Sequence, residues 1–116
     1  FTTNERVELL QEVLKDYSNI EVVSTDELTV NFAEKVQATV MLRGLRMVSD
    51  FEYELQMATL NRHLNNKIET IFIMSSHEYS FLSSSSVKEI ASFGGDVTEF
   101  VPPVVKLALD KKYQKN

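Results

Sequence analysis

The sequence contains no cysteine and no tryptophan, and it has only three glycines and two prolines among its 116 residues. Without cysteine, disulfide bonds and thiolate metal sites are excluded. No apolar run approaches the roughly 18 residues that a membrane-spanning helix requires. These absences predict a cytoplasmic protein that has no membrane partner.

Basic residues are also fewer than acidic ones. Lysine and arginine together number 12 against 17 aspartates and glutamates, which gives a formal net charge of −5. Nonspecific binding to nucleic acid requires a surplus of cations on one face, so we expect no nucleic-acid partner. Any phosphate ligand should be small and held by a local cluster of cations within an acidic surface.

The hydrophobic content of 43% and the charged content of 25% suit a single globular domain over residues 1–116. Strands are expected at 20–23, 38–42 and 70–74, and the nearly continuous apolar run at 38–42 suggests burial on both sheet faces. Helices are expected from a Thr2–Glu5 capping box to about residue 16, over 26–36, from a Ser49 cap to residue 64, from a Ser84 or Ser85 cap to Gly94-Gly95, and from Pro102-Pro103 onward. This alternation predicts an α/β fold with a parallel sheet and helices on both faces.

Two arginines stand at the end of the second expected strand. Arg43 and Arg46 are separated by Gly44 and Leu45, so both guanidinium groups can converge on one anion. An arginine pair alone is weak support for a site, because most charged side chains are exposed and idle. In parallel sheets, however, ligands bind beyond the carboxyl ends of the strands. The position of the pair therefore favours a phosphate-binding role.

A serine-rich segment follows the third expected strand. Residues 80–86 contain five serines, with Phe81 and Leu82 among them and the helical pattern of Val87 and Ile90 after them. Serine runs are usually flexible loops. Here the serines fall at the first turn of a helix, where unpaired amides form an anion cradle and Lys88 adds a cation. We expect this cradle and the arginine pair to face one crevice.

The segments RGLRMVSDFEYELQMATLNRHLN and YSFLSSSSVKE together resemble the bacterial phosphopantetheine adenylyltransferases of the nucleotidylyltransferase superfamily. The resemblance extends over essentially the whole chain and implies a Rossmann-like fold. It implies transfer of AMP from ATP to 4′-phosphopantetheine, which gives dephospho-coenzyme A and pyrophosphate with the help of Mg²⁺, in coenzyme A biosynthesis. It also implies a homohexamer, and coenzyme A as a feedback ligand.

The resemblance assigns roles to particular residues. Arg43 and Arg46 are the expected catalytic residues, and Arg43 also contacts the acceptor together with Leu28 and Thr29. No residue is assigned to the metal. The expected ATP-binding residues are Gly44, Leu45, Arg46, Glu54, Tyr79, Ser80, Phe81, Leu82, Ser83, Ser84 and Ser85. Because a phosphate is already a nucleophile, no general base is needed, and we expect structural or solvent roles for His63 and His77.

One family feature is missing from the sequence. The family opens with a strand and a GxFDPxTxGH loop, whose histidine contacts ATP and which is followed by a substrate-binding lysine, and neither is found here. We therefore expect the carboxyl-terminal two-thirds of an adenylyltransferase, lacking the first two strands and inactive alone, with open space beside residues 20–23 and 38–42. Two alternatives stay open. One is a noncatalytic remnant that binds nucleotide or coenzyme A, and the other is a related nucleotidylyltransferase with another acceptor.

Overall fold

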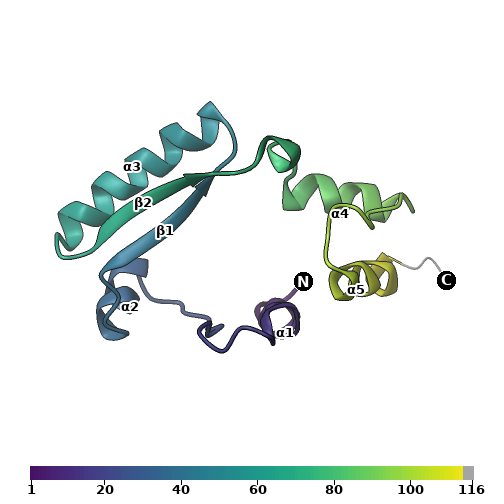
Figure 1. Ribbon diagram of the computed structural model, residues 1–116, viewed down its shortest axis with the longest axis horizontal. Coiled ribbons are helices and arrows are strands. Elements are labelled where there is room, and N and C mark those ends of the chain that lie inside the picture. The colour runs from purple at the N-terminus through teal and green to yellow at the C-terminus, as the bar shows by residue number, and fades with distance from the viewer. Residues whose placement is uncertain (114–116) are drawn as a thin grey trace. The chain divides into compact units, whose positions relative to one another are not determined.

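The structure is a computed structural model that describes residues 1–113, and the chain divides into two compact units. One unit comprises residues 1–24 together with the segment from residue 82 onward, and the other comprises residues 25–81. Figure 1 labels the elements of both. Of the helices in residues 1–113, none combines the length and apolar character needed to cross a membrane.

The unit of residues 25–81 is built on a parallel pair of strands. β1 (Val40–Leu45) pairs with β2 (Glu69–Met74), and they are connected by α3 (Val48–Leu64), which packs against β1. In Figure 1, α3 runs alongside both strands. α2 (Thr29–Lys35) precedes the sheet and the short 3₁₀ helix η1 (His77–Tyr79) follows it. The predicted α/β class with a parallel sheet is confirmed, with two strands among the described residues.

Apolar contacts hold this unit together at two places. Val30 and Ala33 of α2 are buried against Ile68, and Ala38 and Met41 are packed beside them. Between α3 and the sheet, the rings of Phe51 and Phe72 meet edge to face with centroids 6.3 Å apart. An aromatic pair in this geometry is favoured by the ring quadrupoles and fixes the helix over the strands.

The other unit packs three helices. They are α1 (Thr3–Leu14), α4 (Ser84–Ser92) and α5 (Pro103–Tyr113), with a buried cluster of Val87, Ala91, Val97 and Leu109. The predicted capping box is confirmed, because the Thr2 hydroxyl accepts from the Glu5 amide and the Glu5 carboxylate accepts from the Thr2 amide. Gly94 lies just beyond α4 at a φ of 80°, which is the left-handed conformation that ends many helices.

Several predicted boundaries are wrong. Residues 20–23 form no strand, and Ile20 is 46% exposed, because a strand exists only through pairing and no partner lies beside this segment within residues 1–113. β1 extends to residue 45 since its pairing with β2 continues there. Burial on both sheet faces is also wrong, because Leu42 is 63% exposed.

The two predicted helix caps after the strands are wrong as well. Met47, and not Ser49, is the N-cap of α3, and Ser83, and not Ser84 or Ser85, is the N-cap of α4. Of the helix predicted over residues 26–36, only Thr29–Lys35 is helical. The serines at 83 to 85 have equal capping ability, so local pattern alone cannot separate them. At α3 the extended backbone of Met47 sets the helix start, although its side chain makes no capping hydrogen bond.

Candidate functional site

The predicted arginine pair lies at the carboxyl edge of the sheet. Arg43 is inside β1, opposite Phe72, and Arg46 is the first residue beyond the strand. The prediction that Arg43 follows the strand is therefore wrong. The amide of Ser75, which follows β2, donates to the carbonyl of Leu45 at 2.7 Å. Arg46 and the segment that begins at Ser75 thus leave the same edge, where parallel sheets bind ligands.

Arg43 forms a two-pronged ion pair with Glu54 of α3. Its Nε donates to Oε2 at 2.8 Å and its Nη2 donates to Oε1 at 2.6 Å. The Arg43 hydrogen bonds hold the pKa of Glu54 below its ordinary value, and Glu54 in turn raises the pKa of Arg43. The Glu54 side chain is only 12% exposed, against 53% for Arg43. Glu54, predicted to contact the nucleotide, is thus turned toward an arginine.

Arg46 is held by Asp50 in the first turn of α3. Asp50 Oδ2 accepts from the main-chain amide of Arg46 at 3.2 Å and from its Nε at 3.0 Å, and Oδ1 accepts from Nη2 at 3.2 Å. The Arg46 side chain, followed by main-chain amides, lowers the pKa of Asp50. Sequence reasoning missed Asp50. The available signal was its spacing of four residues from Arg46 across a strand-to-helix junction.

The serine segment divides into capping and exposed side chains. The Ser83 hydroxyl accepts from the Ser86 amide at 3.1 Å, and the Ser86 hydroxyl accepts from the Ser83 amide at 3.1 Å. Ser84 and Ser85 are exposed, and within residues 1–113 their hydroxyls make no hydrogen bond. Lys88, one turn into α4, is exposed too. The start of α4 therefore presents hydroxyls beside the unpaired amides of its first turn.

Comparison with known proteins identifies the family of the chain. Residues 1–90 match the cytidylyltransferase-like family model. The chain is 55% identical over all 116 of its residues to the phosphopantetheine adenylyltransferase of Caldanaerobacter subterraneus subsp. tengcongensis, and it covers 72% of that protein. It is 53% identical over 112 residues, 97% of the chain, to the phosphopantetheine adenylyltransferase of Alkaliphilus metalliredigens, and this match covers 71% of that protein. The chain belongs to the phosphopantetheine adenylyltransferase family.

This membership confirms the resemblance found in the sequence. The structure places the predicted site residues in two groups. The first group lies in the unit of residues 25–81 and consists of Leu28, Thr29, Arg43, Gly44, Leu45, Arg46, Glu54, Tyr79, Ser80 and Phe81. The second consists of Leu82, Ser83, Ser84 and Ser85 in the other unit. Convergence of the two groups on one crevice stays a prediction.

Within the first group the residues differ in what they can offer a ligand. Leu45 is only 4% exposed, so its side chain belongs to the core. Gly44 has open space where a side chain would begin, since an added Cβ would meet nothing within 4 Å. Leu28 caps α2 and is 59% exposed, as an apolar wall for a ligand must be. Tyr79 is 49% exposed, whereas the Ser80 hydroxyl donates to the His77 carbonyl at 3.0 Å.

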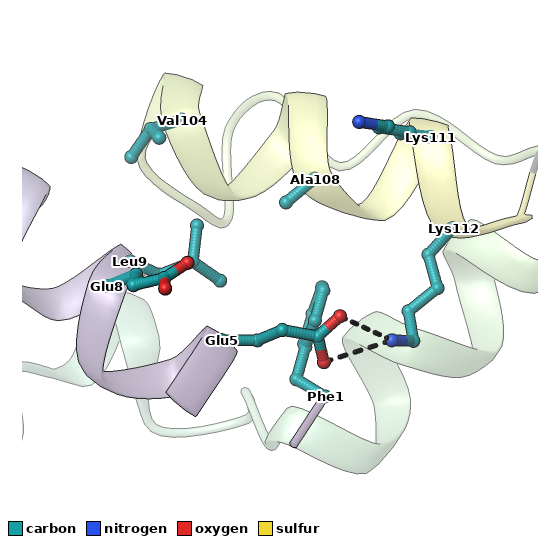
Figure 2. Close-up of a pocket in the computed structure, with 8 residues that line it drawn as sticks. All are labelled: Phe1, Glu5, Glu8, Leu9, Val104, Ala108, Lys111 and Lys112. Carbon is teal, nitrogen blue, oxygen red and sulfur yellow. Dashed lines mark hydrogen bonds and ion pairs between the residues drawn. The ribbon is translucent and has the colours of Figure 1, made fainter. Parts of the chain in front are cut away.

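A separate hollow of about 560 Å³ lies between α1 and α5 of this adenylyltransferase-family chain (Figure 2). Of its two lysines, Lys112 is paired, with Nζ 3.1 Å from both carboxylate oxygens of Glu5 and 4.8 Å from the centre of the Phe1 ring. It is lined by Phe1, Glu5, Glu8, Leu9, Val104, Ala108, Lys111 and Lys112. None of these is a predicted site residue.

Proposed function

We propose that this protein, as the complete enzyme, transfers the adenylyl group of ATP to 4′-phosphopantetheine, forming dephospho-coenzyme A and pyrophosphate in coenzyme A biosynthesis. The observation that carries the proposal is identity of 55% over the whole chain with a phosphopantetheine adenylyltransferase. The arginines at the carboxyl edge of β1 and β2 supply a physical reason, because the reaction brings several phosphate groups together. The broader cytidylyltransferase-like match fits the chemistry but does not select an acceptor.

The reaction requires little covalent chemistry from the protein. An oxygen of the acceptor phosphate attacks the α-phosphorus of ATP, and the bond from that phosphorus to the bridging oxygen of the β-phosphate breaks. The bond electrons leave with pyrophosphate. Catalysis of such an in-line transfer consists mainly of positioning and charge stabilisation. Fixed guanidinium groups provide both, because they offset the repulsion between two anions and need not reorganise during the reaction.

We assign Arg43 to the acceptor phosphate, with Leu28 and Thr29 along the pantetheine arm, and Arg46 to the phosphates of ATP. Support for the two arginine assignments comes from their places, because Arg43 is in the carboxyl-terminal half of β1 and Arg46 follows the strand. Ser84 and Ser85 are proposed as a second phosphate cradle, since their hydroxyls are exposed at the start of α4. Gly44 leaves open space beside the strand, where ATP could approach the backbone.

Mg²⁺ is proposed as the accompanying ion, and no residue is assigned to it. Within residues 1–113 no group of three or more histidine, aspartate or glutamate side chains is arranged to hold a metal. Asp50 and Glu54, the carboxylates beside the arginines, accept hydrogen bonds from them. Magnesium in nucleotide enzymes is commonly bound through substrate phosphates and water with few protein ligands, and it supplies positive charge to the phosphates.

We further propose a homohexamer in the cytoplasm, with coenzyme A as a feedback ligand. Family membership is the support for these three statements. Sedimentation velocity should give a mass close to six chains, and a monomer or dimer at micromolar concentration would contradict the assembly. Coenzyme A should compete with 4′-phosphopantetheine in the forward assay, and purely uncompetitive inhibition would contradict a shared site.

The experiment for the function measures dephospho-coenzyme A and pyrophosphate with the complete wild-type enzyme, with its variants Arg46→Ala and Arg46→Lys, and with the control Arg62→Ala. Arg62 is in the last turn of α3, whereas Arg46 precedes the first turn. The side chain of Arg62 is 70% exposed. Loss of one preorganised charge contact commonly costs about 10²-fold or more in turnover, so we expect that loss in Arg46→Ala. Lysine should recover little because it lacks the planar fork. Arg62→Ala should retain wild-type turnover.

The same experiment separates the alternatives. ATP binding without product would favour a noncatalytic nucleotide-binding role. Adenylylation of a different phosphate acceptor, with none of 4′-phosphopantetheine, would favour a related nucleotidylyltransferase. Near-normal turnover of Arg46→Ala would assign that arginine to the surface and remove it from the site.

A further inference from the structure

We propose that Asp50 is a positioning residue that fixes the orientation of Arg46 for phosphate binding. This inference rests on the proposed function, which assigns Arg46 to the phosphates of ATP. It concerns a carboxylate that sequence reasoning did not select and that has no assigned part in the reaction. Asp50 acts through Arg46 and makes no contact of its own with substrate.

The contacts of Asp50 distinguish it from an ordinary surface ion partner. A single carboxylate accepts from the main-chain amide of Arg46 and from Nε and Nη2 of the same residue, at 3.0 to 3.2 Å. Asp50 therefore restrains the backbone and the far end of the side chain together. Arginine has high rotamer entropy, and its planar fork is useful for phosphate only when the plane is correctly aimed.

The position of Asp50 in the fold makes this restraint rigid. Arg46 is the first residue after β1, and Asp50 is in the first turn of α3, so the contacts close the short junction from strand to helix. The carboxylate is also favoured by its place at a helix N-terminus. The side chains of Arg46 and Asp50 are 37% and 26% exposed, which leaves them at the surface of the sheet edge and within reach of a ligand.

The neighbouring ion pair of Arg43 and Glu54 differs from that of Arg46 and Asp50. Within residues 1–113, Glu54 meets Arg43 only through the two carboxylate oxygens and the guanidinium, and the main-chain amide of Arg43 takes no part. Arg43 is itself inside β1, where strand pairing already fixes its backbone. Arg46 lies beyond that pairing, so Asp50 supplies the restraint that the sheet no longer provides.

The test compares Asp50→Asn with Glu52→Gln in the complete enzyme. Asparagine has the shape of aspartate, but its amide nitrogen cannot accept from a guanidinium, so one side of the fork is lost. Glu52 is an exposed carboxylate on the same helix, and its side chain makes no hydrogen bond or ion pair within residues 1–113. Its substitution therefore removes the same charge without touching Arg46. Asp50→Glu, which keeps the charge, serves as a partial rescue.

A misplaced catalytic group can lose on the order of 10²-fold in rate, so Asp50→Asn should lower kcat at least about tenfold. The KM for 4′-phosphopantetheine should change less than about threefold, because that ligand is assigned to Arg43. In an Arg46→Ala background the Asp50→Asn change should have no further effect, since residues that act as one unit are non-additive. Glu52→Gln should match the wild type.

A readout independent of catalysis is the Nε–H resonance of Arg46 in the NMR spectrum of the protein. Its proton should be protected in the wild type and in Glu52→Gln, and exchange-broadened or shifted in Asp50→Asn. Asp50→Glu should restore part of the protection. If the wild type forms no dephospho-coenzyme A, the proposed function fails, and this resonance still decides whether Asp50 orients Arg46.

Several results would overturn the inference. Turnover of Asp50→Asn equal to that of Glu52→Gln would assign Asp50 to the surface. Tighter ATP binding with full turnover in Asp50→Asn would make the carboxylate a competitor of phosphate. A further tenfold loss in the Arg46→Ala background, or an unchanged Nε–H resonance, would show that Asp50 acts by another route.

Discussion

At the scale of single residues, the two arginines are restrained by carboxylates before any ligand is present. Arg43 is held by Glu54 and Arg46 by Asp50, and both acceptors come from α3. Exposed ion pairs contribute little to stability, about 1 kcal/mol or less. Their proposed value lies in orientation, because a guanidinium fork that is already held in place loses less freedom when it binds phosphate.

The contacts of Glu54 lead to a prediction that separates two roles. If Glu54 acts through Arg43, Glu54→Gln should raise the KM for 4′-phosphopantetheine several-fold and change the KM for ATP much less. The reason is that Glu54 accepts from Nε and Nη2 of Arg43, at 2.8 and 2.6 Å. Initial-rate assays with each substrate varied in turn measure both constants. A loss confined to ATP would instead support the sequence-based role as a nucleotide contact.

At the scale of elements, the start of α4 combines a structural serine with exposed ones. Ser83 closes the capping box with Ser86, whereas Ser84 and Ser85 present their hydroxyls to solvent. Composition predicted a serine-lined helix start, and this is confirmed. The prediction that Ser84 or Ser85 caps the helix is wrong, because Ser83, Ser84 and Ser85 are chemically equivalent and only the backbone selects Ser83.

The different roles proposed for these serines can be tested. Ser83→Ala should lower the free energy of unfolding by about 1 kcal/mol, since it removes an N-cap. The double change Ser84→Ala with Ser85→Ala should cost little stability and should weaken ATP binding more than 4′-phosphopantetheine binding. Urea denaturation and calorimetric titration with each ligand measure the two effects. Equal losses for the two ligands, or none, would remove Ser84 and Ser85 from the ATP site.

Elements whose signals are local were predictable from the sequence, and those that depend on partners were not. The Thr2–Glu5 box lies within four residues, and the helix starting at Pro103 follows from the fixed φ of proline. A strand at 20–23 was predicted from β-branched residues, but pairing creates a strand and none occurs there among residues 1–113.

The candidate site, too, could be predicted from the sequence only in part. The pattern alone placed both Arg43 and Arg46 beyond the strand. This is confirmed for Arg46 and wrong for Arg43, because the pairing of β1 with β2 continues to Leu45 and cannot be read from hydrophobicity. The pairing of Arg43 with Glu54 spans 11 residues and depends on how α3 packs on β1, so no spacing rule indicates it. The roles of these residues toward a ligand stay predictions until the variants are measured.

At the scale of the whole molecule, ionised carboxylates stabilise both units. In residues 25–81 they are Asp50 and Glu54, and in the other unit they are Glu5 and Asp96. Each has a pKa below its ordinary value. The first cause is an arginine hydrogen bond for Asp50 and Glu54, the Thr2 amide for Glu5, and the Thr98 hydroxyl for Asp96. In the acid range, the stability of the chain is therefore linked to pH through carboxylates whose pKa values are all lowered.

The sign of that linkage gives the last prediction. A carboxylate whose folded pKa lies below its unfolded pKa releases its proton more readily when folded, so the unfolded chain binds more protons. The ordinary value is 4.5 for Glu54, so its contribution should be complete well above that pH and should be lost as the pH falls through the lower folded value. Glu54 should dominate, because its side chain is only 12% exposed and hence less screened by solvent.

Urea unfolding between about pH 7 and pH 3 should show a free energy of unfolding that is nearly constant above about pH 6 and falls below about pH 5. In Glu54→Gln the fall should be smaller, and in the control Glu52→Gln it should parallel the wild type. A fall of equal size in Glu54→Gln and in the wild type would show that the Arg43–Glu54 pair contributes nothing to acid stability.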